Sequence, residues 1–211
     1  MPVSCPTRPV PRIQLRSVTV RRGPRTVVSG LDLDVAAGRV FWLVGPNGAG
    51  KSSLLRVMAG LDPPERGTVE RTGDRAGFLY YHAEMTLPPW CVVRSWERLV
   101  RRLLPAPVPP TVLRPALGPG RRVRRLSTGE RKRLLLDALL RAPGSLLLDE
   151  PFEHLSSEAK IALARMLEER AAGSVVVVAT NQETERAARD GGLRLEAGAA
   201  AATAWTPEER S

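Results

Sequence analysis

Hydrophobic and polar residues follow two repeats along this chain, and each repeat predicts a different kind of element. Between residues 31 and 35, Leu and Val alternate with two Asp, which predicts a half-exposed antiparallel strand. Residues 13–20 show the same alternation with one break. Shorter runs are mostly apolar, which is typical of strands buried on both faces, and they lie at 39–44, 78–81, 146–148, 175–180 and 193–195.

Apolar residues at helical spacing separate these runs. They predict helices at 51–59, 94–104, 127–141, 156–170 and 183–190, and Gly60 is expected to end the first of them. In the helix at 94–104, the residues that share one side are Trp96, Leu99, Leu103 and Leu104. Because strands alternate with amphipathic helices, we expect an α/β fold whose mostly parallel core sheet is covered on both faces and carries an antiparallel β edge.

The middle of the chain differs in composition from both ends. Residues 105–120 contain six Pro and two Gly, so this stretch is expected to be irregular. We therefore interpret residues 82–126 as a helical lobe inserted into a single domain, 1–211. The other parts of this domain are expected to be a core at 13–81 and 127–196, and loose termini at 1–12 and 197–211.

The bulk composition fits one globular domain without disulfides. Hydrophobic residues make up 43% and charged residues 26% of the 211 residues, which excludes an intrinsically disordered chain. Cys5 and Cys91 are isolated, which favours a reducing compartment. No apolar stretch approaches the roughly 20 residues that span a bilayer, and residues 1–12 hold no apolar leader core. We therefore expect a cytoplasmic protein, in which any membrane role must come through a partner.

The formal net charge of +10 comes almost entirely from Arg, since only Lys51, Lys132 and Lys160 are Lys. The plainer interpretation is a composition biased toward Arg. The sharper interpretation is a surface for anionic partners, either lipid headgroups or nucleic acid, and the basic run at 121–125 favours it.

A glycine-rich motif, G-x-x-x-x-G-K-[ST], lies between the apolar run at 39–44 and the helix at 51–59. Glycines let the main chain wrap a phosphate, while loop N–H groups and the helix N-terminus point at the anion. Lys51 is expected to reach the β- and γ-phosphates, and the Ser52 hydroxyl to ligate Mg²⁺. The predicted ATP-binding residues are Gly45, Pro46, Asn47, Gly48, Ala49, Gly50, Lys51, Ser52 and Ser53.

Two acids end the apolar run at 146–148. A buried parallel strand delivers Asp149 and Glu150 to the carboxyl edge of the sheet, where ligands of open α/β sheets bind. Asp149 is expected to hold Mg²⁺ together with Ser52, and Glu150 to polarise the attacking water as a general base.

The segment Leu126-Ser127-Thr128-Gly129-Glu130 helps to indicate which family of phosphate-loop proteins this chain resembles. Ser127 and Glu130 have the spacing of a capping box at the start of a helix, which is its plainer interpretation. The order of motifs, a phosphate loop, a helical lobe, this segment and then Asp149-Glu150-Pro151, resembles the ATP-binding cassette (ABC) family over about residues 13–196. The resemblance makes Ser127, Thr128, Gly129 and Glu130 the signature motif.

The resemblance implies a P-loop NTPase fold and a dimer, identical or mixed, in which two cassettes enclose two ATP molecules. Each ATP then lies between one phosphate loop and the partner's signature, where Ser127 and Gly129 meet the γ-phosphate. It further implies ATP and Mg²⁺ as cofactors, a separate membrane-spanning transporter subunit, and a peripheral position on the inner face of the cell membrane.

Several positions depart from the family pattern. Asn181 stands where the family has its catalytic switch histidine, and an amide hydrogen-bonds a phosphate oxygen without carrying a proton. The candidates for the family's Q-loop glutamine are Tyr81 and His82, and Ser156 replaces the D-loop aspartate. Arg22 stands where an aromatic residue stacks on adenine. These departures predict ATP binding with an altered rate of hydrolysis.

Three functions follow from these observations. The first is a subunit that hydrolyses Mg-ATP to drive transport. The second is a degenerate cassette that binds ATP as a dimer clamp with little turnover, which the altered positions favour and Glu150 disfavours. The third is a cassette acting on nucleic acid or ribosomes; the net charge favours it, but such proteins carry two cassettes or long insertions, so a nucleic-acid partner is not expected.

Overall fold

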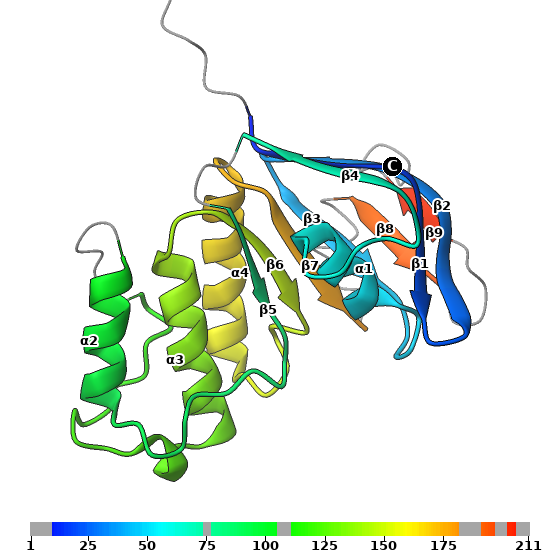
Figure 1. The fold of residues 1–211 in the computed structure, drawn as a ribbon. Helices are drawn as coiled ribbons and strands as arrows, with labels where there is room; N and C mark the ends of the chain where they lie inside the picture. The colour runs from blue at the N-terminus through cyan, green and yellow to red at the C-terminus, as the bar shows by residue number, and fades with distance from the viewer. Residues whose placement is uncertain (1–9, 74–76, 105–110, 182–190, 197–201, 206–211) are drawn as a thin grey trace, which may run out of the picture.

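The computed structural model describes residues 10–73, 77–104, 111–181, 191–196 and 202–205. Strands and helices alternate along these residues and form two sheets with helices packed against them (Figure 1). None of the helices within the described ranges is long and apolar enough to cross a bilayer. The helix expected at 183–190 lies outside the described residues.

The smaller sheet is antiparallel and has the order β2-β1-β4. Its strands are β1 (Arg12–Arg22), β2 (Arg25–Ala36) and β4 (Arg66–Thr72). The break in the alternation of β1 is a bulge at Ser17, which has a φ of 48° and whose N–H donates to Asp32 Oδ1 at 2.9 Å. Strand β4 was not predicted, because its sequence, RGTVERT, buries none of its side chains fully and so lacks a strand's apolar repeat.

The larger sheet has the order β5-β6-β7-β3-β8-β9, and all its neighbours are parallel except β8 and β9. Its strands are β3 (Val40–Val44), β5 (Phe78–Tyr81), β6 (Ser145–Asp149), β7 (Val176–Thr180), β8 (Gly192–Leu195) and β9 (Ala202–Trp205). The expectation of a loose C-terminal region is wrong at β9, because pairing with β8 supplies an order that the Ala-rich sequence does not encode.

Successive residues of the central strands face two separate cores. Leu43, Leu147 and Val177 pack with α1 (Lys51–Ala59) and with β1 and β2. Their neighbours Leu146 and Val176 pack with α3 (Thr128–Arg141) and α4 (Ser157–Ala171) on the opposite face. Figure 1 shows this layering, with α1 on one side of the sheet and α3 and α4 on the other. The predicted mostly parallel α/β sheet, covered on both faces, is confirmed.

The middle of the chain contains α2 (Val93–Leu103) and a short 3-10 helix, η1 (Val123–Arg125). The predicted packed side of α2 is wrong in part, since Leu99 and Leu103 are 47% and 72% exposed. Val93 and Val100 are the buried residues of this helix. Two β-branched residues seven apart were a weaker signal than the more numerous Leu and Trp, although they lie on one helical face.

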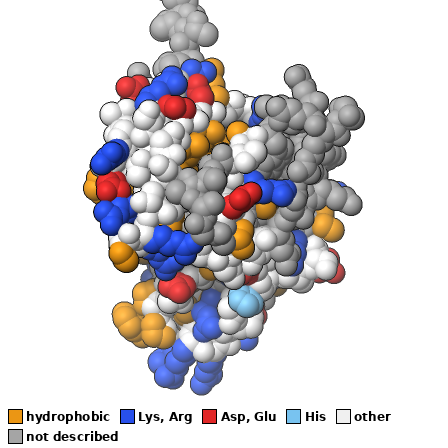
Figure 2. Space-filling model, turned by 90° about the vertical axis from the view of Figure 1, so that its right-hand side faces the viewer, with side chains coloured by type: hydrophobic (Ala, Val, Ile, Leu, Met, Phe, Trp, Pro, Cys, Tyr) orange, Lys and Arg blue, Asp and Glu red, His pale blue; other side chains and the backbone are white. Residues whose placement is uncertain are grey.

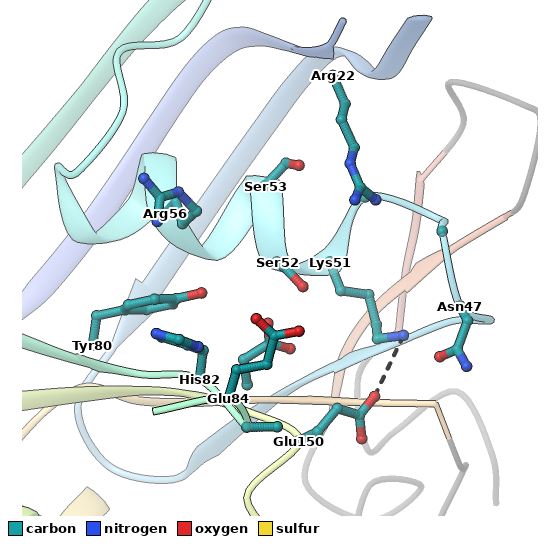
Figure 3. Close-up of a pocket in the computed structure, with 14 residues that line it drawn as sticks. Arg22, Asn47, Lys51, Ser52, Ser53, Arg56, Tyr80, His82, Glu84 and Glu150 are labelled. Carbon is teal, nitrogen blue, oxygen red and sulfur yellow. Dashed lines mark ion pairs between the residues drawn. The ribbon is translucent and has the colours of Figure 1, made fainter. Parts of the chain in front are cut away.

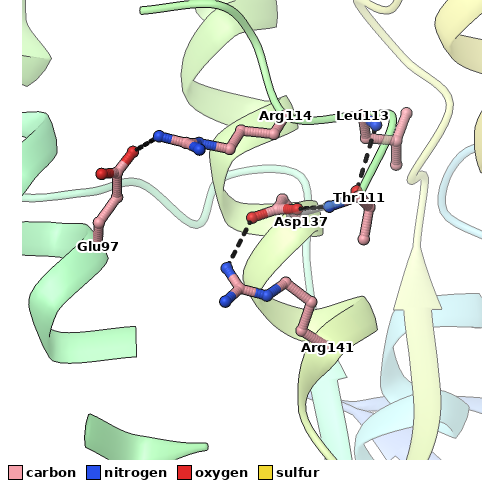
Figure 4. A network of polar contacts seen from close by, with 6 residues as sticks. All are labelled: Glu97, Thr111, Leu113, Arg114, Asp137 and Arg141. Atoms are coloured by element: carbon pink, nitrogen blue, oxygen red, sulfur yellow. Dashed lines mark hydrogen bonds and ion pairs between the residues drawn. The ribbon is translucent and has the colours of Figure 1, made fainter. Parts of the chain in front are cut away.

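Polar contacts hold the segment that begins at Thr111 against α2 and α3 (Figure 4). The Thr111 N–H donates to the buried Asp137 carboxylate at 2.6 Å, and Arg141 donates to the same carboxylate at 3.2 Å. Arg114 forms an ion pair with Glu97 of α2. A buried carboxylate with two donors explains why a charge is tolerated inside α3.

The Arg residues are spread over the surface. Figure 2 shows Lys and Arg scattered over one face of the molecule, several beside Asp or Glu. Exposed ion pairs of this kind join Arg12 to Asp34 and Arg56 to Asp62. Where the structure describes that face, its basic side chains form no continuous stripe of the kind that tracks a nucleic-acid backbone.

Candidate functional site

The phosphate-loop motif joins β3 to α1. Helix α1 begins at Lys51, and its N-cap residue is Gly50, with a φ of 101° and no side-chain cap hydrogen bond. The first N–H groups of a helix have no partner within the helix, and they carry the positive end of the helix dipole. The N-terminus of α1 is therefore a site for an anion.

Two glycines of the loop are required by space, and one of them is also required by conformation. A Cβ on Gly45 would lie 2.4 Å from the Leu195 carbonyl oxygen of β8. A Cβ on Gly50 would lie 2.6 Å from the Val27 Cβ of β2, and the φ of Gly50 already disfavours any other residue. The loop is thus packed closely between the two sheets, which fixes where its N–H groups point.

A cavity of about 410 Å³ opens beside this loop (Figure 3). It brings the phosphate loop together with the ends of β5 and β6, although these segments are far apart in the sequence. The lining residues are Arg22, Asn47, Gly48, Gly50, Lys51, Ser52, Ser53, Arg56, Tyr80, His82, Ala83, Glu84, Asp149 and Glu150. Of the predicted ATP-binding residues, Gly45, Pro46 and Ala49 are not in this lining.

Lys51 is held by its own loop. Its ammonium group donates to the Gly45 carbonyl at 2.7 Å and to the Pro46 carbonyl at 3.2 Å, and its side chain is almost fully buried. The same nitrogen lies 3.6 Å from Glu150 Oε1 (Figure 3). Because an ammonium group has three donors, one remains for a ligand in the cavity.

Burial raises the pKa of both acids at the end of β6. For Asp149 this effect is opposed by a hydrogen bond from Ser52 and by the charge of Lys51. For Glu150 the charge of Lys51 opposes it. Within the described residues, Glu150 Oε1 is buried without a hydrogen-bond partner. A buried acceptor of this kind suits a water molecule or a ligand donor.

The residues at the cavity fit a Mg-nucleotide. Mg²⁺ is commonly bound by one or two protein oxygens together with phosphate oxygens and water, and Ser52 and Asp149 present two such oxygens side by side. No cluster of three or more His, Cys, Asp or Glu suited to a metal occurs in the described ranges.

The signature segment lies away from this cavity, and none of its four residues lines it. Ser127 caps α3: its hydroxyl accepts from the Glu130 N–H at 3.1 Å, while Glu130 accepts from the Ser127 N–H at 2.7 Å. The predicted capping box is therefore present. These hydrogen bonds lower the pKa of Glu130, with the contact to the Ser127 N–H as the main cause and Arg121 assisting.

The residues that depart from the ABC family pattern lie in different surroundings. Tyr81 is 1% exposed and faces the core, whereas His82 lines the cavity and stacks with Tyr80 at 5.9 Å between ring centroids. Asn181 follows β7, is exposed and is not in the lining. Ser156 caps α4 by accepting from the Ala159 N–H.

Some lining residues were missed by sequence reasoning, namely Tyr80, Arg56, Ala83 and Glu84. A signal for Tyr80 exists, because alternate residues of a strand face opposite sides and Tyr81 is buried in the other core. Arg22, which stands where the family has an aromatic residue that stacks on adenine, also lines the cavity.

Comparison with known proteins supports the interpretation of this cavity as a nucleotide-binding site. Residues 28–95 match the family model for ABC transporters. The zinc import ATP-binding protein ZnuC of Yersinia pestis is 35% identical over 163 residues, which cover 74% of this chain and 64% of that protein. The aliphatic sulfonates import ATP-binding protein SsuB 2 of Pseudomonas savastanoi is 36% identical over 164 residues, 74% of this chain and 59% of that protein.

Solved structures share the fold. An ATP-binding subunit of an ABC transporter superposes with a TM-score of 0.70 at 22% identity, covering 91% of this chain and 89% of that one. A bacterial Atm1-family ABC exporter with ATP bound gives a TM-score of 0.70 at 20% identity, covering 91% of this chain and 38% of that one.

The chain spans about three fifths of the length of these import relatives. The matched part contains the phosphate loop, which forms the cavity with the acids of β6. Motif order, fold and relatives agree, and the chain belongs to the ATP-binding cassette family.

Proposed function

We propose that this chain binds and hydrolyses Mg-ATP and so drives transport through a separate membrane-spanning subunit. The observation that carries the proposal is the convergence of Lys51, Ser52, Asp149 and Glu150 in one cavity at the N-terminus of α1. The relatives named above for zinc and for sulfonate import resemble this chain about equally. Their likeness therefore supports the shared nucleotide chemistry rather than a particular cargo.

Binding rests on the phosphate loop. The N–H groups of the loop and of the first turn of α1 donate to phosphate oxygens, and the Lys51 ammonium adds a charge beside the β- and γ-phosphates. Ser53 lines both this cavity and an adjoining one bounded by Arg21, Arg22 and Arg56. The remaining part of the nucleotide is expected in that adjoining cavity.

Hydrolysis rests on the acids of β6. Ser52 and Asp149 would hold Mg²⁺, which neutralises charge on the β- and γ-phosphates when bound. Glu150 takes a proton from the attacking water through its unpartnered Oε1. Burial raises the pKa of this carboxyl, which brings it closer to neutral pH and makes it a better base.

Closure of the site is expected to need a second cassette. Ser127, Thr128, Gly129 and Glu130 do not line the cavity of their own chain, which supports their role toward a partner's ATP. The Ser127 hydroxyl can donate to a phosphate oxygen while it accepts from the Glu130 N–H.

A titration with a fluorescent ATP analogue tests the binding step. The wild type is expected to saturate with an affinity that improves when Mg²⁺ is added, because Ser52 and Asp149 would hold the metal and its charge would offset that of the phosphates. Asp149→Asn should lose most of this Mg²⁺ effect, while the exposed Asp34→Asn serves as the matched control and should keep it. No saturable binding by the wild type would refute the proposal.

The membrane partner is tested by purification. A tagged chain extracted with mild detergent from its native membranes should carry one polytopic membrane protein, identified by mass spectrometry. A chain recovered only from the soluble fraction, at native expression and with no membrane protein, would refute the transport role and the peripheral membrane location.

A low-turnover clamp is the second candidate, and Asn181 favours it. This residue is exposed outside the cavity lining and cannot accept the proton that a switch histidine accepts. If the clamp is correct, Asn181→His should raise the ATPase rate. A wild type that is already fast, with no gain in this variant, would exclude the clamp.

A further inference from the structure

A buried lysine outside the nucleotide cavity contacts the main chain of Glu150. Lys132 of α3 is 5% exposed, and its Nζ donates to the Glu150 carbonyl oxygen at 2.7 Å. The same nitrogen lies 5.8 Å from the centroid of the Tyr81 ring. Burial lowers the pKa of Lys132 to about 8, while Glu153 and Glu150 act in the opposite direction. Keeping a charge in this place is costly, so its contacts must offset that cost.

The contact falls on a strained residue. Glu150 has a φ of 49°, a left-handed conformation that is unfavourable for a residue other than Gly. Its N–H donates to the Ala179 carbonyl of β7 at 3.0 Å, and its carbonyl accepts from Lys132. Two different elements therefore hold the two main-chain polar groups of Glu150. In this conformation its carboxylate faces Lys51 across the cavity (Figure 3).

The N-terminus of α3 also packs against the chain that follows Glu150. A Cβ on Gly129 would lie 3.0 Å from the His154 carbonyl oxygen, and His154 also has a positive φ. Lys132 comes three residues after Gly129 on the same helix, so both contacts join one turn of α3 to the segment 150–154. A displacement of this turn therefore moves the groups that hold Glu150.

We propose that Lys132 is a positioning residue that fixes the main chain of Glu150 and couples the signature end of α3 to the base in the same chain's own cavity. The proposal rests on the proposed function, since it requires Glu150 to act as the base. When the signature meets the partner's nucleotide, α3 carries that contact to Glu150 through the Lys132 hydrogen bond. Each cassette then senses the nucleotide on its partner through its own glutamate.

The test compares Lys132→Met, Lys132→Arg and the matched control Lys160→Met, which removes an exposed lysine of α4. Four quantities are measured: nucleotide Kd, kcat for ATP, KM for ATP, and hydrogen exchange of the peptide 150–155. Lys132→Met should lower kcat by about 10- to 100-fold, the value of one charged hydrogen bond. Its Kd should stay within about twofold, because Lys132 does not line the cavity. Exchange in 150–155 should become faster.

Lys132→Arg should restore most of kcat and the slow exchange, because it keeps a cation with donors. An unchanged kcat in Lys132→Met would overturn the proposal, as would an equal loss of affinity and turnover. A lower kcat without faster exchange would also overturn it. If Lys132→Met does not fold, Lys132→Gln replaces it, and an intermediate kcat with intermediate exchange is the supporting result.

The two proposals fail in different ways. If the wild type binds nucleotide without hydrolysing it, the assignment of Glu150 as a base is wrong and the coupling proposal falls with it. If the wild type hydrolyses ATP but Lys132→Met matches it in kcat, only the role of Lys132 is refuted.

Discussion

Two helix N-termini of the chain carry predicted phosphate sites, and they differ in how they are capped. Helix α1 has as its N-cap a glycine in a left-handed conformation and has no side-chain cap. Helix α3 has Ser127 as its N-cap and a complete capping box, so two backbone donors at this end are already bonded to side chains. The first N-terminus opens into the cavity of its own chain, and the second does not.

This difference shows how one fold can form one anion site that is ready to bind in a single chain and a second site that needs a ligand already held elsewhere. An uncapped helix end leaves its N–H groups and its dipole for an anion, so the phosphate loop is ready to bind in a single chain. A capped end offers fewer donors and depends on a ligand that arrives already held elsewhere. We therefore expect changes at α1 to affect nucleotide affinity and changes at α3 to affect it little.

The largest effect is expected from Lys51→Ala. It removes the only ammonium group in the cavity lining among the described residues, and it takes one donor away from each of the Gly45 and Pro46 carbonyls. Nucleotide Kd should rise at least about 100-fold, from the loss of one or two charged hydrogen bonds. The measurement is the fluorescent-nucleotide titration, with Lys160→Ala as control and thermal unfolding to verify folding. Unchanged affinity would contradict the phosphate-loop assignment.

Glu150→Gln separates binding from chemistry at the α1 site. The amide keeps the size of the side chain but cannot take a proton from water, so kcat should fall about 10²- to 10⁴-fold. Affinity should be retained, and a dimer should accumulate with ATP because hydrolysis no longer dissolves it. Light scattering at saturating ATP measures this, and a monomer under those conditions would argue against two cassettes enclosing the nucleotide.

Two glycines of the phosphate loop provide a matched pair of variants for measuring how the packing of the loop affects stability. Gly50 and Gly48 both have positive φ, but only at Gly50 would a Cβ collide with a neighbour, the Val27 side chain. Gly48→Ala should cost about 1 kcal/mol of unfolding free energy, and Gly50→Ala about 2–3 kcal/mol. Chemical denaturation with the two variants side by side measures the difference. Equal costs would show that the close packing against β2 does not constrain the loop.

The smallest effect is expected in the pH dependence of stability, and it comes from Glu130 at the N-terminus of α3. The Ser127 N–H lowers the pKa of Glu130 in the folded protein, so this carboxylate stabilises the fold above its unfolded pKa. That contribution is lost as pH falls through the lower, folded pKa. Glu130→Gln should therefore unfold slightly earlier than wild type at neutral pH, and the two should converge in acid, below the ordinary glutamate pKa of about 4.3. A gap in Tm that persists in acid would contradict this.

Much of the fold could be predicted because its central strands and helices carry strong local patterns. The helix at 51–59 has the predicted bounds, since a phosphate-loop motif precedes it and Gly60 ends it in a left-handed conformation. Strands β4 and β9 were not predicted, because their sequences are polar or Ala-rich and only pairing with β1 and β8 orders them. Their registers belong to the sheet rather than to the local chain.

The candidate site, like the fold, could be predicted from the sequence only in part. The identities of Lys51, Ser52, Asp149 and Glu150 follow from motifs whose chemistry requires those residue types at that spacing. The motifs did not reveal that Tyr80 and His82 line the same cavity or that Lys132 holds Glu150. Those contacts join segments distant in sequence, and no local repeat carries them.

The sequence by itself determined which groups are available: a glycine-rich loop before a helix, two acids after a buried strand, and a capping box at the start of a second helix. Only the tertiary structure decided that the first two sets meet in one cavity and that the third stays outside it. The physical reason is that strand order in a parallel sheet is set by packing over its whole area. Local patterns fix each element, while the sheet decides which of their ends become neighbours.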